Sequence, residues 1–341
     1  MTSQRDFVPE VIPPVLKQAE ASVTVARIDD DDIFIGPRKL LYKPPFARGV
    51  YGGQVIGQAL MAAANTVPPS VPIHSFHCYF ILGGNPDRDI VYTVKRLRDG
   101  RAFFTRSVVA RQGGTPIFTM AAQFHVPEPS RGLSYREPIP EGITRPEDLL
   151  DIYEYWAAIQ DHPRLHANLK DYIQSAQNRP VTTDQRIVHR SFLRHNGKHR
   201  ADLIPHLWPL MIGDGKPLRY IWMKSHTPLD GGPNIHKCVI AFMSDMAFIP
   251  TAMEPLYSNE HTKKSPRVAM TVSLDHSMWF HSDIPELRAD EWLLFEMRCH
   301  VTGGGRALLT GKVWSQAGGL VVTVTQEALI RLQDDNANSK L

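Results

Sequence analysis

One carboxylate stands inside an apolar stretch and is the residue best suited to acid–base chemistry. Asp245 interrupts a run of mostly apolar residues from Cys238 to Ile249. Carboxylates are seldom fully buried without a partner, because moving a charge out of water costs several kcal/mol. The residues alone leave two interpretations open. Asp245 is either a structural residue with satisfied hydrogen bonds, or a general base at the mouth of a pocket.

An amide occupies a comparable position in a later stretch. In residues 320–332, strand alternation places Val322, Val324 and Gln326 on one face, so Gln326 ends an apolar stripe. A buried amide must find hydrogen-bond partners. A strand end close to solvent is the alternative. A second polar residue in apolar surroundings favours the catalytic interpretation of Asp245.

Hydroxyl, carboxylate and imidazole groups lie close together in residues 271–277. Asp275 and His276 are adjacent, and neighbours in a strand point to opposite faces, so we do not expect them to line one pocket. The same alternation predicts one shared face for Ser273, Asp275 and Ser277. We therefore interpret His276, and its counterpart His74 in the first half, as structural residues.

The sequence contains none of the common nucleophile or phosphate-binding motifs. There is no Gly-x-Ser-x-Gly, no Gly-x-Gly-x-x-Gly and no phosphate-loop pattern. Residues 303–305, three consecutive glycines, are predicted to form a turn between strands. The absence of a nucleophile motif favours direct attack by water over a covalent intermediate.

The two halves of the chain carry the same landmarks in the same order. Each landmark recurs about 200 residues later, which indicates a duplicated unit. The pairs are His74-Ser75 with His276-Ser277, Gly100-Arg101-Ala102 with Gly305-Arg306-Ala307, Gly113-Gly114 with Gly318-Gly319, and Gln123 with Gln326.

Each unit is predicted to contain one long helix followed by an antiparallel sheet that wraps it, an α+β arrangement. In the first unit we expect a helix over 54–65 and strands over 73–82, 89–99, 102–112 and 115–126. In the second unit we expect a helix over 235–249, ended by Pro250. Its strands are predicted over 269–280, 291–302, 307–316 and 320–332.

These elements predict a first domain over 1–126 and a second over 201–333. Residues 127–200 are predicted to be a linker with surface helices near 147–160 and 165–174, and 334–341 a flexible tail. His162 and His166 have the spacing of a metal-binding pair. No acidic or cysteine partner stands in register with them, so we place them on a solvated helix face and predict no metal site.

Composition excludes several classes of protein. With 341 residues, 43% hydrophobic and 21% charged, the chain suits two soluble globular domains. The net charge of +3 is too small to indicate nucleic-acid binding. No run is long enough to insert in a membrane, and no signal or transit peptide is evident. Three widely spaced cysteines favour a reducing compartment without disulfides.

The chain ends in Ser339-Lys340-Leu341. This tripeptide is the address of the peroxisomal matrix, which is read by an import receptor and does not anchor a protein to a membrane. The preceding residues are polar and are expected to leave the signal accessible. The sequence therefore predicts a peroxisomal matrix protein.

Several of these segments resemble the type II acyl-CoA thioesterases, which include bacterial thioesterase II and the peroxisomal acyl-CoA thioesterases. The resemblance extends from about Arg48 to Arg331. The matching segments are 48–60 (RGVYGGQVIGQAL), 74–80 (HSFHCYF), 97–101 (LRDGR), 244–245 (SD), 274–281 (LDHSMWFH) and 325–327 (TQE). The resemblance implies a double hotdog, two fused repeats that each wrap a sheet round a helix.

The resemblance also implies a catalytic trio of Asp245, Ser273 and Gln326, with serine at a position where bacterial members often have threonine. Asp245 would activate water against the thioester of a fatty acyl-CoA, without a cofactor. By the helix alignment Asp245 corresponds to Gln58, so the site of the first unit is expected to be degenerate.

The remaining expectations concern the substrate and rival functions. Basic residues that could contact the CoA phosphates are Arg98, Arg101, Arg106 and Arg306, although solvated arginines are the alternative. The rival functions are a hotdog hydratase, which would need a histidine on the helix or its following loop, and a non-catalytic acyl-CoA-binding module. Hotdog units pair edge to edge, so the chain supplies one such pair itself, and a homo-oligomer stays possible.

Overall fold

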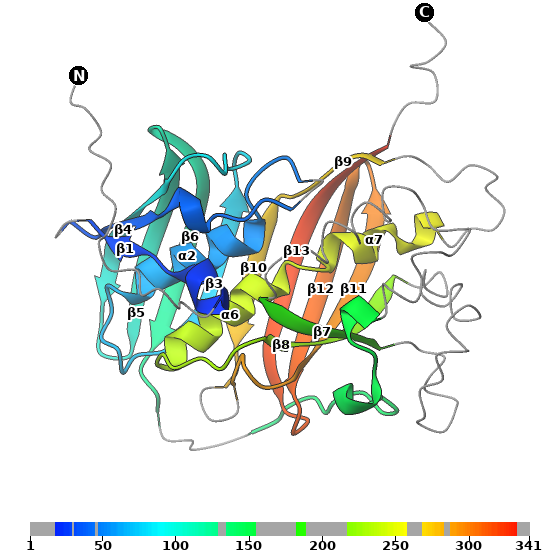
Figure 1. Cartoon of the computed structure of the whole chain (residues 1–341). Coiled ribbons are helices and arrows are strands. Elements are labelled where there is room, and N and C mark those ends of the chain that lie inside the picture. The colour runs from blue at the N-terminus through cyan, green and yellow to red at the C-terminus, as the bar shows by residue number, and fades with distance from the viewer. Residues whose placement is uncertain are drawn as a thin grey trace, which may run out of the picture.

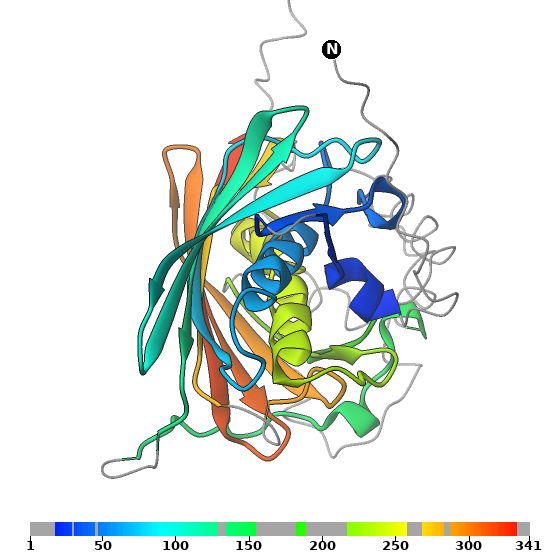
Figure 2. The ribbon, with the colours of Figure 1, turned by 90° about the vertical axis from the view of Figure 1, so that its left-hand side faces the viewer.

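The protein is built around a single curved antiparallel sheet with two central helices on its concave side (Figures 1 and 2). The computed structural model describes residues 18–28, 31–44, 47–128, 134–154, 182–188, 217–257, 268–282 and 287–332. The helices are α1 Gln18–Val23, α2 Gly52–Ala64, α6 Pro233–Ser244 and α7 Phe248–Tyr257, with short 3-10 turns at Arg38–Leu40 and Pro146–Asp148.

The strands form one continuous sheet across both units. In the first unit they are β1 Ala26–Arg27, β2 Ile33–Gly36, β3 Ile73–Phe80, β4 Ile90–Asp99, β5 Phe103–Gln112 and β6 Thr115–His125. The others are β7 Thr183–Val188, β8 Leu218–Ser225, β9 Val268–Ser273, β10 Asp275–Phe280, β11 Leu293–Gly303, β12 Arg306–Ser315 and β13 Leu320–Leu332.

The order of the strands mirrors itself about the centre of the sheet, which confirms the duplication. The central part runs β2-β4-β5-β6-β3 and then β10-β13-β12-β11-β8, so each strand has a counterpart on the other side. The two units join where β3 pairs with β10, with Phe76 opposite Met278. The edge-to-edge pairing of the two units is therefore internal to the chain.

Helices α2 and α6 pack against each other and against the sheet, and almost every side chain of both is buried. Two glycines in α2 allow the close approach. A Cβ atom added to Gly57 would lie 3.1 Å from the carbonyl oxygen of Cys238 in α6. Buried residues such as Ile56 and Leu60 each contribute roughly 2 kcal/mol by leaving water. Both units thus wrap a sheet round a buried helix, and the predicted double hotdog is confirmed.

The long helix predicted over 235–249 is wrong, because it is two helices. α6 ends at Ser244, and α7 begins at Phe248. Pro250 does not end a helix. It lies in the first turn of α7, where the missing N–H of proline costs no hydrogen bond. The break places Asp245 at the end of α6 rather than inside a helix.

The strand predicted over 269–280 is also interrupted. β9 and β10 both pair with β13, with Ser273 opposite Ala328 and Ser277 opposite Thr325. Between these two pairs, β9 and β10 advance by four residues while β13 advances by three. The extra residue forms a bulge around Leu274. A bulge changes which face the following side chains occupy. The shared face predicted for Ser273 and Ser277 is consequently wrong.

The segment predicted as a linker contributes a strand to the part of the sheet that belongs to the second unit. β7 lies within 127–200 and pairs with β8 at the sheet edge. Of the helix predicted over 147–160, the structure has a 3-10 turn at Pro146–Asp148 and helical residues at 152–154, and 155–160 lie outside the described residues. The helix over 165–174, the pair His162 and His166, and the C-terminal tripeptide lie outside the described residues. None of the described helices is both long and apolar enough to cross a bilayer.

Candidate active site

Asp245 is the C-cap residue of α6 and lies in the short break before α7. Its backbone is still helical, with φ −82° and ψ −6°, so its side chain leaves the helix axis where the buried helix stops. The residue itself is partly buried, while the neighbouring Ser244 is fully buried. The sequence places a carboxylate in apolar surroundings, and the helix break gives that carboxylate polar partners.

The hydroxyl and the amide predicted to accompany Asp245 both contact it. Ser273, the last residue of β9, donates from Oγ to Asp245 Oδ1 at 3.2 Å. Gln326 in β13 donates from Nε2 to the same oxygen at 3.2 Å and to Ser273 Oγ at 2.7 Å. Three residues from a helix end and two strands therefore share one cluster of hydrogen bonds.

The first unit completes the cluster. The N–H of Gly53, in the first turn of α2, donates to Asp245 Oδ2 at 2.9 Å. Tyr51, the residue before α2, donates its hydroxyl to the carbonyl oxygen of Phe242 at 2.8 Å, and the two rings meet edge to face. These contacts hold the start of α2 against the end of α6. A helix start carries partial positive charge, which suits a carboxylate.

The pKa of Asp245 is raised from 3.8 to about 6. Burial is the largest cause, because it penalises the charged form. The hydrogen bonds from Ser273, Gln326 and the Gly53 backbone lower the pKa but do not cancel the effect of burial. A carboxyl with a pKa near 6 is ionised at neutral pH and basic enough to accept a proton from water.

His276 is a neighbour of the cluster that the sequence analysis placed elsewhere. Its Nδ1 atom lies 2.8 Å from Gln326 Oε1, so the ring and the amide are on the same side of the sheet. The bulge around Leu274 produces this placement. Asp275 does point away, and its carboxylate accepts the N–H of Glu327 at 2.8 Å. Alternation alone offered no signal for the bulge.

Comparisons with known proteins show the family of this chain. Residues 42–125 match the family described as acyl-CoA thioesterase N-terminal domain, and residues 175–330 match the acyl-CoA thioesterase C-terminal domain. The chain is 34% identical to mouse acyl-coenzyme A thioesterase 8, over 92% of this chain and 88% of the relative. The chain belongs to the acyl-CoA thioesterase family.

Two further comparisons agree with that assignment. The crystal structure of an acyl-CoA thioesterase II from Mycobacterium marinum has a TM-score of 0.64 and 29% identity, over 93% of this chain and 98% of that chain. The peroxisomal acyl-coenzyme A thioester hydrolase 1 of Saccharomyces cerevisiae is 26% identical, over 84% of this chain and 87% of the relative. The protein is thus a thioester hydrolase of the type II family.

Cys78 lies near the carboxylate of the thioesterase but has the properties of a structural residue. It is buried in β3, and its thiol donates to the carbonyl oxygen of His276 at 3.1 Å. Burial, followed by the nearby charge of Asp245, raises the pKa of Cys78 well above its ordinary value. A thiol that stays protonated is a poor nucleophile.

The arginines suggested as CoA ligands of the thioesterase are in different places. Arg106 is 1% exposed and bonds to Thr66 and Asp99, so its prediction as a phosphate contact is wrong. Thr66 follows α2 at the end opposite Gly53, about 18 Å away along a helix of this length. Arg98 bonds to Arg106 through its carbonyl oxygen and lies at that remote end too. Arg101 is exposed in the turn that follows β4.

Arg306 is closer to the cluster. It begins β12 opposite Leu329 of β13, three residues from Gln326. Its guanidinium is exposed and pairs with Glu327 at 2.9 Å. Glu327 follows Gln326 in β13 and therefore points to the other face of the sheet, so the side chain of Arg306 lies on the face opposite the cluster.

The equivalence of Asp245 with Gln58 stays a prediction. Asp245 lies in the break between α6 and α7, and α7 packs on β11 and β12 as α2 packs on β4 and β5, so α6 and α7 together correspond to α2. Gln58 lies in the middle of α2, where its Oε1 accepts the hydroxyl of Tyr92 at 2.8 Å. The first unit of the thioesterase thus has an amide, and no carboxylate, at the position predicted to match Asp245.

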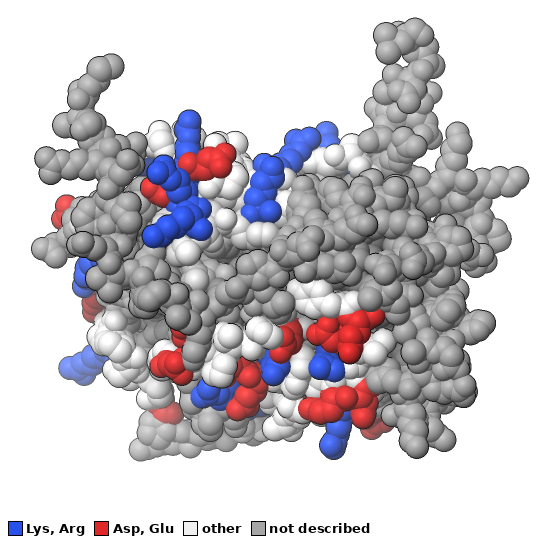
Figure 3. Space-filling view, in the orientation of Figure 1, with Lys and Arg blue, Asp and Glu red and all other residues white. Residues whose placement is uncertain are grey.

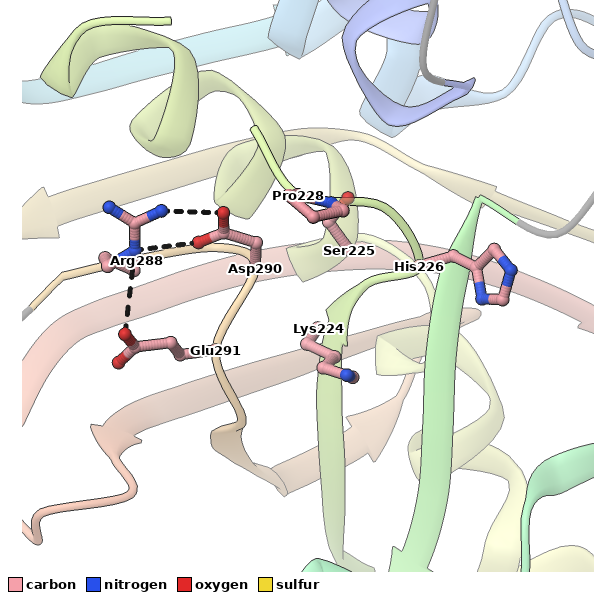
Figure 4. Close-up of a pocket in the computed structure, with 7 residues that line it drawn as sticks. All are labelled: Lys224, Ser225, His226, Pro228, Arg288, Asp290 and Glu291. Carbon is pink, nitrogen blue, oxygen red and sulfur yellow. Dashed lines mark hydrogen bonds and ion pairs between the residues drawn. The ribbon is translucent and has the colours of Figure 1, made fainter. Parts of the chain in front are cut away.

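A surface pocket in the second unit is separate from this cluster (Figure 4). It is lined by Lys224, Ser225, His226, Pro228, Arg288, Asp290 and Glu291. Asp290 approaches His236 near the start of α6, whereas Asp245 is at its end. Arg288 pairs with Asp290 at 2.8 Å and Lys224 with Asp184 at 3.5 Å, so the pocket offers little positive charge for a phosphate.

Among the described residues, the charged side chains on the face of the thioesterase shown in Figure 3 do not form one patch of a single sign. Lys and Arg side chains gather in the upper part of that face, and positive and negative side chains are mixed below. Within the described residues, no three His, Cys, Asp or Glu side chains come together as the ligands of a metal ion would.

Proposed function

We propose that the protein hydrolyses fatty acyl-CoA to a fatty acid and free CoA, with Asp245 as the general base. The observation that carries this proposal is the contact of one carboxylate with a hydroxyl and an amide at the junction of the two units. The trio implied by the family resemblance thus lies in one place. The raised pKa of Asp245 supports the role of a base.

The reaction follows from the geometry of the cluster. Ser273 and Gln326 orient a water molecule, and Asp245 accepts its proton as the oxygen attacks the thioester carbonyl carbon. The carbon–sulfur bond of the resulting tetrahedral intermediate then breaks. The CoA thiolate leaves, and the proton held by Asp245 returns to it or to solvent. A thiolate is a good leaving group, so no strong acid is required.

The oxyanion of the intermediate needs hydrogen-bond donors close to Asp245. The first N–H groups of a helix have no acceptor within that helix and carry partial positive charge. Gly52 begins α2, and its Cα is so close to Asp245 that an added Cβ would lie 2.8 Å from Oδ2. We assign the oxyanion to the start of α2, so that the first unit stabilises a reaction whose base is in the second.

We propose the peroxisomal matrix as the location, because Ser339-Lys340-Leu341 has the sequence of the signal that the peroxisomal import receptor reads. The yeast relative whose name places it in the peroxisome supports the same location. Fatty acyl-CoA of that compartment is then the proposed substrate.

The test is the release of free thiol from palmitoyl-CoA by the purified protein. The change Asp245→Asn should lower kcat at least about 100-fold and leave palmitoyl-CoA binding largely intact, because only the proton acceptor is lost. The matched control is Asp275→Asn, a carboxylate on the opposite face of the sheet, which should stay within about twofold of wild type.

Two outcomes would overturn the proposal. Unchanged turnover by Asp245→Asn would exclude this residue as the base. A wild-type protein that binds palmitoyl-CoA in a calorimetric titration but releases no thiol would be the non-catalytic binding module. The hydratase has less support, because the amide of Gln326 separates His276 from Asp245.

A further inference from the structure

His276 lies directly behind the amide of Gln326, on the side away from Asp245. Nδ1 of His276 is 2.8 Å from Gln326 Oε1, while Gln326 Nε2 contacts Asp245 and Ser273. Both His276 and Gln326 are fully buried. The imidazole therefore contacts the proposed catalytic machinery through one residue and has no path of its own to a soluble substrate.

In the part of the chain that the structure describes, the contacts of the ring are aromatic and neutral polar groups. Phe76 of β3 stacks on one face at a centroid distance of 6.0 Å, and Phe248 of α7 meets the ring edge-on at 6.0 Å. Its polar neighbours are Gln326 and, at Nε2, the hydroxyl of Ser244 at 3.0 Å. Burial lowers the pKa of His276 to about 4, so the ring is neutral at physiological pH.

A neutral imidazole has one N–H, and the hydrogen bonds decide which nitrogen carries it. An ionised Asp245 accepts hydrogen bonds and donates none, so Gln326 must direct its N–H₂ group toward it. The carbonyl oxygen of Gln326 then points at His276 and requires a donor at Nδ1. Nε2 becomes an acceptor for Ser244, whose hydroxyl proton is shared with the carbonyl oxygen of Ala241, 2.8 Å away.

We propose that His276 is a positioning residue for the proposed hydrolysis, which holds the Gln326 amide with its N–H₂ group toward Asp245 and Ser273. The inference rests on the proposed function of that site. A terminal amide rotates with little intrinsic preference between its two flipped forms. Without a donor behind it, Gln326 can direct its carbonyl oxygen at Asp245, where it repels the carboxylate and cannot support it.

Two variants of similar size separate this role from packing. His276→Asn retains an amide N–H at about the position of Nδ1, whereas His276→Leu fills the site without a donor. We expect His276→Leu to lower kcat about tenfold to hundredfold with little change in KM, because the misplaced group orients water and does not bind CoA. His276→Asn should stay within about threefold of wild type.

Two measurements distinguish this role from a purely structural one: the pH profile of kcat, and the effect of His276→Leu in a Gln326→Ala background. The hydrogen bond from Gln326 lowers the pKa of Asp245, so its loss in His276→Leu should shift the acidic limb of the kcat profile to higher pH. His276→Asn should leave that limb in place. In a Gln326→Ala background, His276→Leu should change kcat by less than about twofold, since the group that it orients is already absent.

Thermal unfolding of each variant shows whether it is folded. If His276→Leu does not fold, His276→Gln replaces it, because its longer side chain places the amide near Nε2 and away from Gln326. The same loss of kcat is then expected. Equal kcat for the Asn variant and for whichever of the other two folds, or full additivity with Gln326→Ala, would overturn the inference.

The Asp245→Asn variant, measured alongside, distinguishes the two levels of proposal. If wild type releases thiol, Asp245→Asn does not, and His276→Leu equals wild type, then the role of His276 is refuted and the proposed function stands. If Asp245→Asn keeps full activity, the proposed site itself is refuted, and the orienting role of His276 falls with it.

Discussion

Asp245 is held between two opposing effects. Burial disfavours its charge, while Ser273, Gln326 and the N–H of Gly53 favour it. The result is a pKa of about 6, between that of a solvated carboxyl and that of one buried without partners. This compromise gives a base that is ionised near neutral pH and still able to hold a proton, and it has consequences for both rate and stability.

The pH dependence of the rate is the first prediction. Only ionised Asp245 accepts a proton, so kcat should fall about tenfold per pH unit below an apparent pKa near 6 and reach a plateau above it. Initial rates of thiol release, read at a wavelength insensitive to pH, test this. A limb near pH 4, the value of a solvated carboxyl, would contradict the burial argument.

Stability should respond in the opposite sense. A carboxyl whose pKa is higher in the folded than in the unfolded protein binds its proton more tightly when folded. Stability is therefore lost as pH rises from about 3.8 through about 6. Asp245→Asn removes this penalty and should stabilise the fold by about 1 to 3 kcal/mol at pH 8. Chemical denaturation at pH 8 and pH 5 measures it, and the gain should shrink at pH 5.

At the scale of elements, the site depends on the contact between two helices. The end of α6 carries the carboxylate and the start of α2 carries its backbone donor. This contact is close because Gly53 has no side chain. An added Cβ would collide with the carbonyl oxygen of Phe242 and lie 2.6 Å from the Tyr51 ring. Both the packing of α2 against α6 and the hydrogen bond to Asp245 therefore require glycine at position 53.

Gly53→Ala should therefore affect both properties. We expect a loss of about 1 to 3 kcal/mol in unfolding free energy and a lower kcat, since the start of α2 must move away from Asp245. Gly303→Ala is the matched control, because a Cβ there meets no atom within 4 Å. Denaturation curves and thiol release measure both effects. Similar behaviour of the two variants would show that the helix contact does not position the site.

At the scale of the whole molecule, a mirrored sheet contains a single carboxylate site. The strand order is symmetric about the pairing of β3 with β10. The two units are not equivalent in chemistry, because the first has the amide of Gln58 at the position predicted to match Asp245. The first unit nevertheless contributes Gly53 to the site. Both halves therefore contribute to the proposed active centre.

The proposed peroxisomal location depends on the last three residues of the sequence. Removal of residues 339–341 should leave thiol release unchanged and abolish import into peroxisomes, since the signal is read by a receptor and makes no contribution to the site. Fluorescence microscopy of the protein tagged at its N-terminus tests this. Peroxisomal signal from the shortened chain would show that a different segment directs it.

Much of the architecture could be predicted from the sequence, because a duplicated unit repeats its turns and its apolar periodicity. The landmarks shared by the halves predicted the repeat, and Asp245 and Gln326 stood out as polar residues in apolar runs. Family resemblance added Ser273 to them. These signals are local in the chain, or are repeated along it, and need no knowledge of packing.

What tertiary structure alone decided is which groups from distant segments meet. The bulge around Leu274 depends on how β9 and β10 each pair with β13, and it brings His276 to the side of Gln326. The donor from Gly53 depends on the packing of α2 against α6. Strand alternation and helix periodicity describe one segment at a time, whereas register and helix contact are set by the neighbour against which that segment packs.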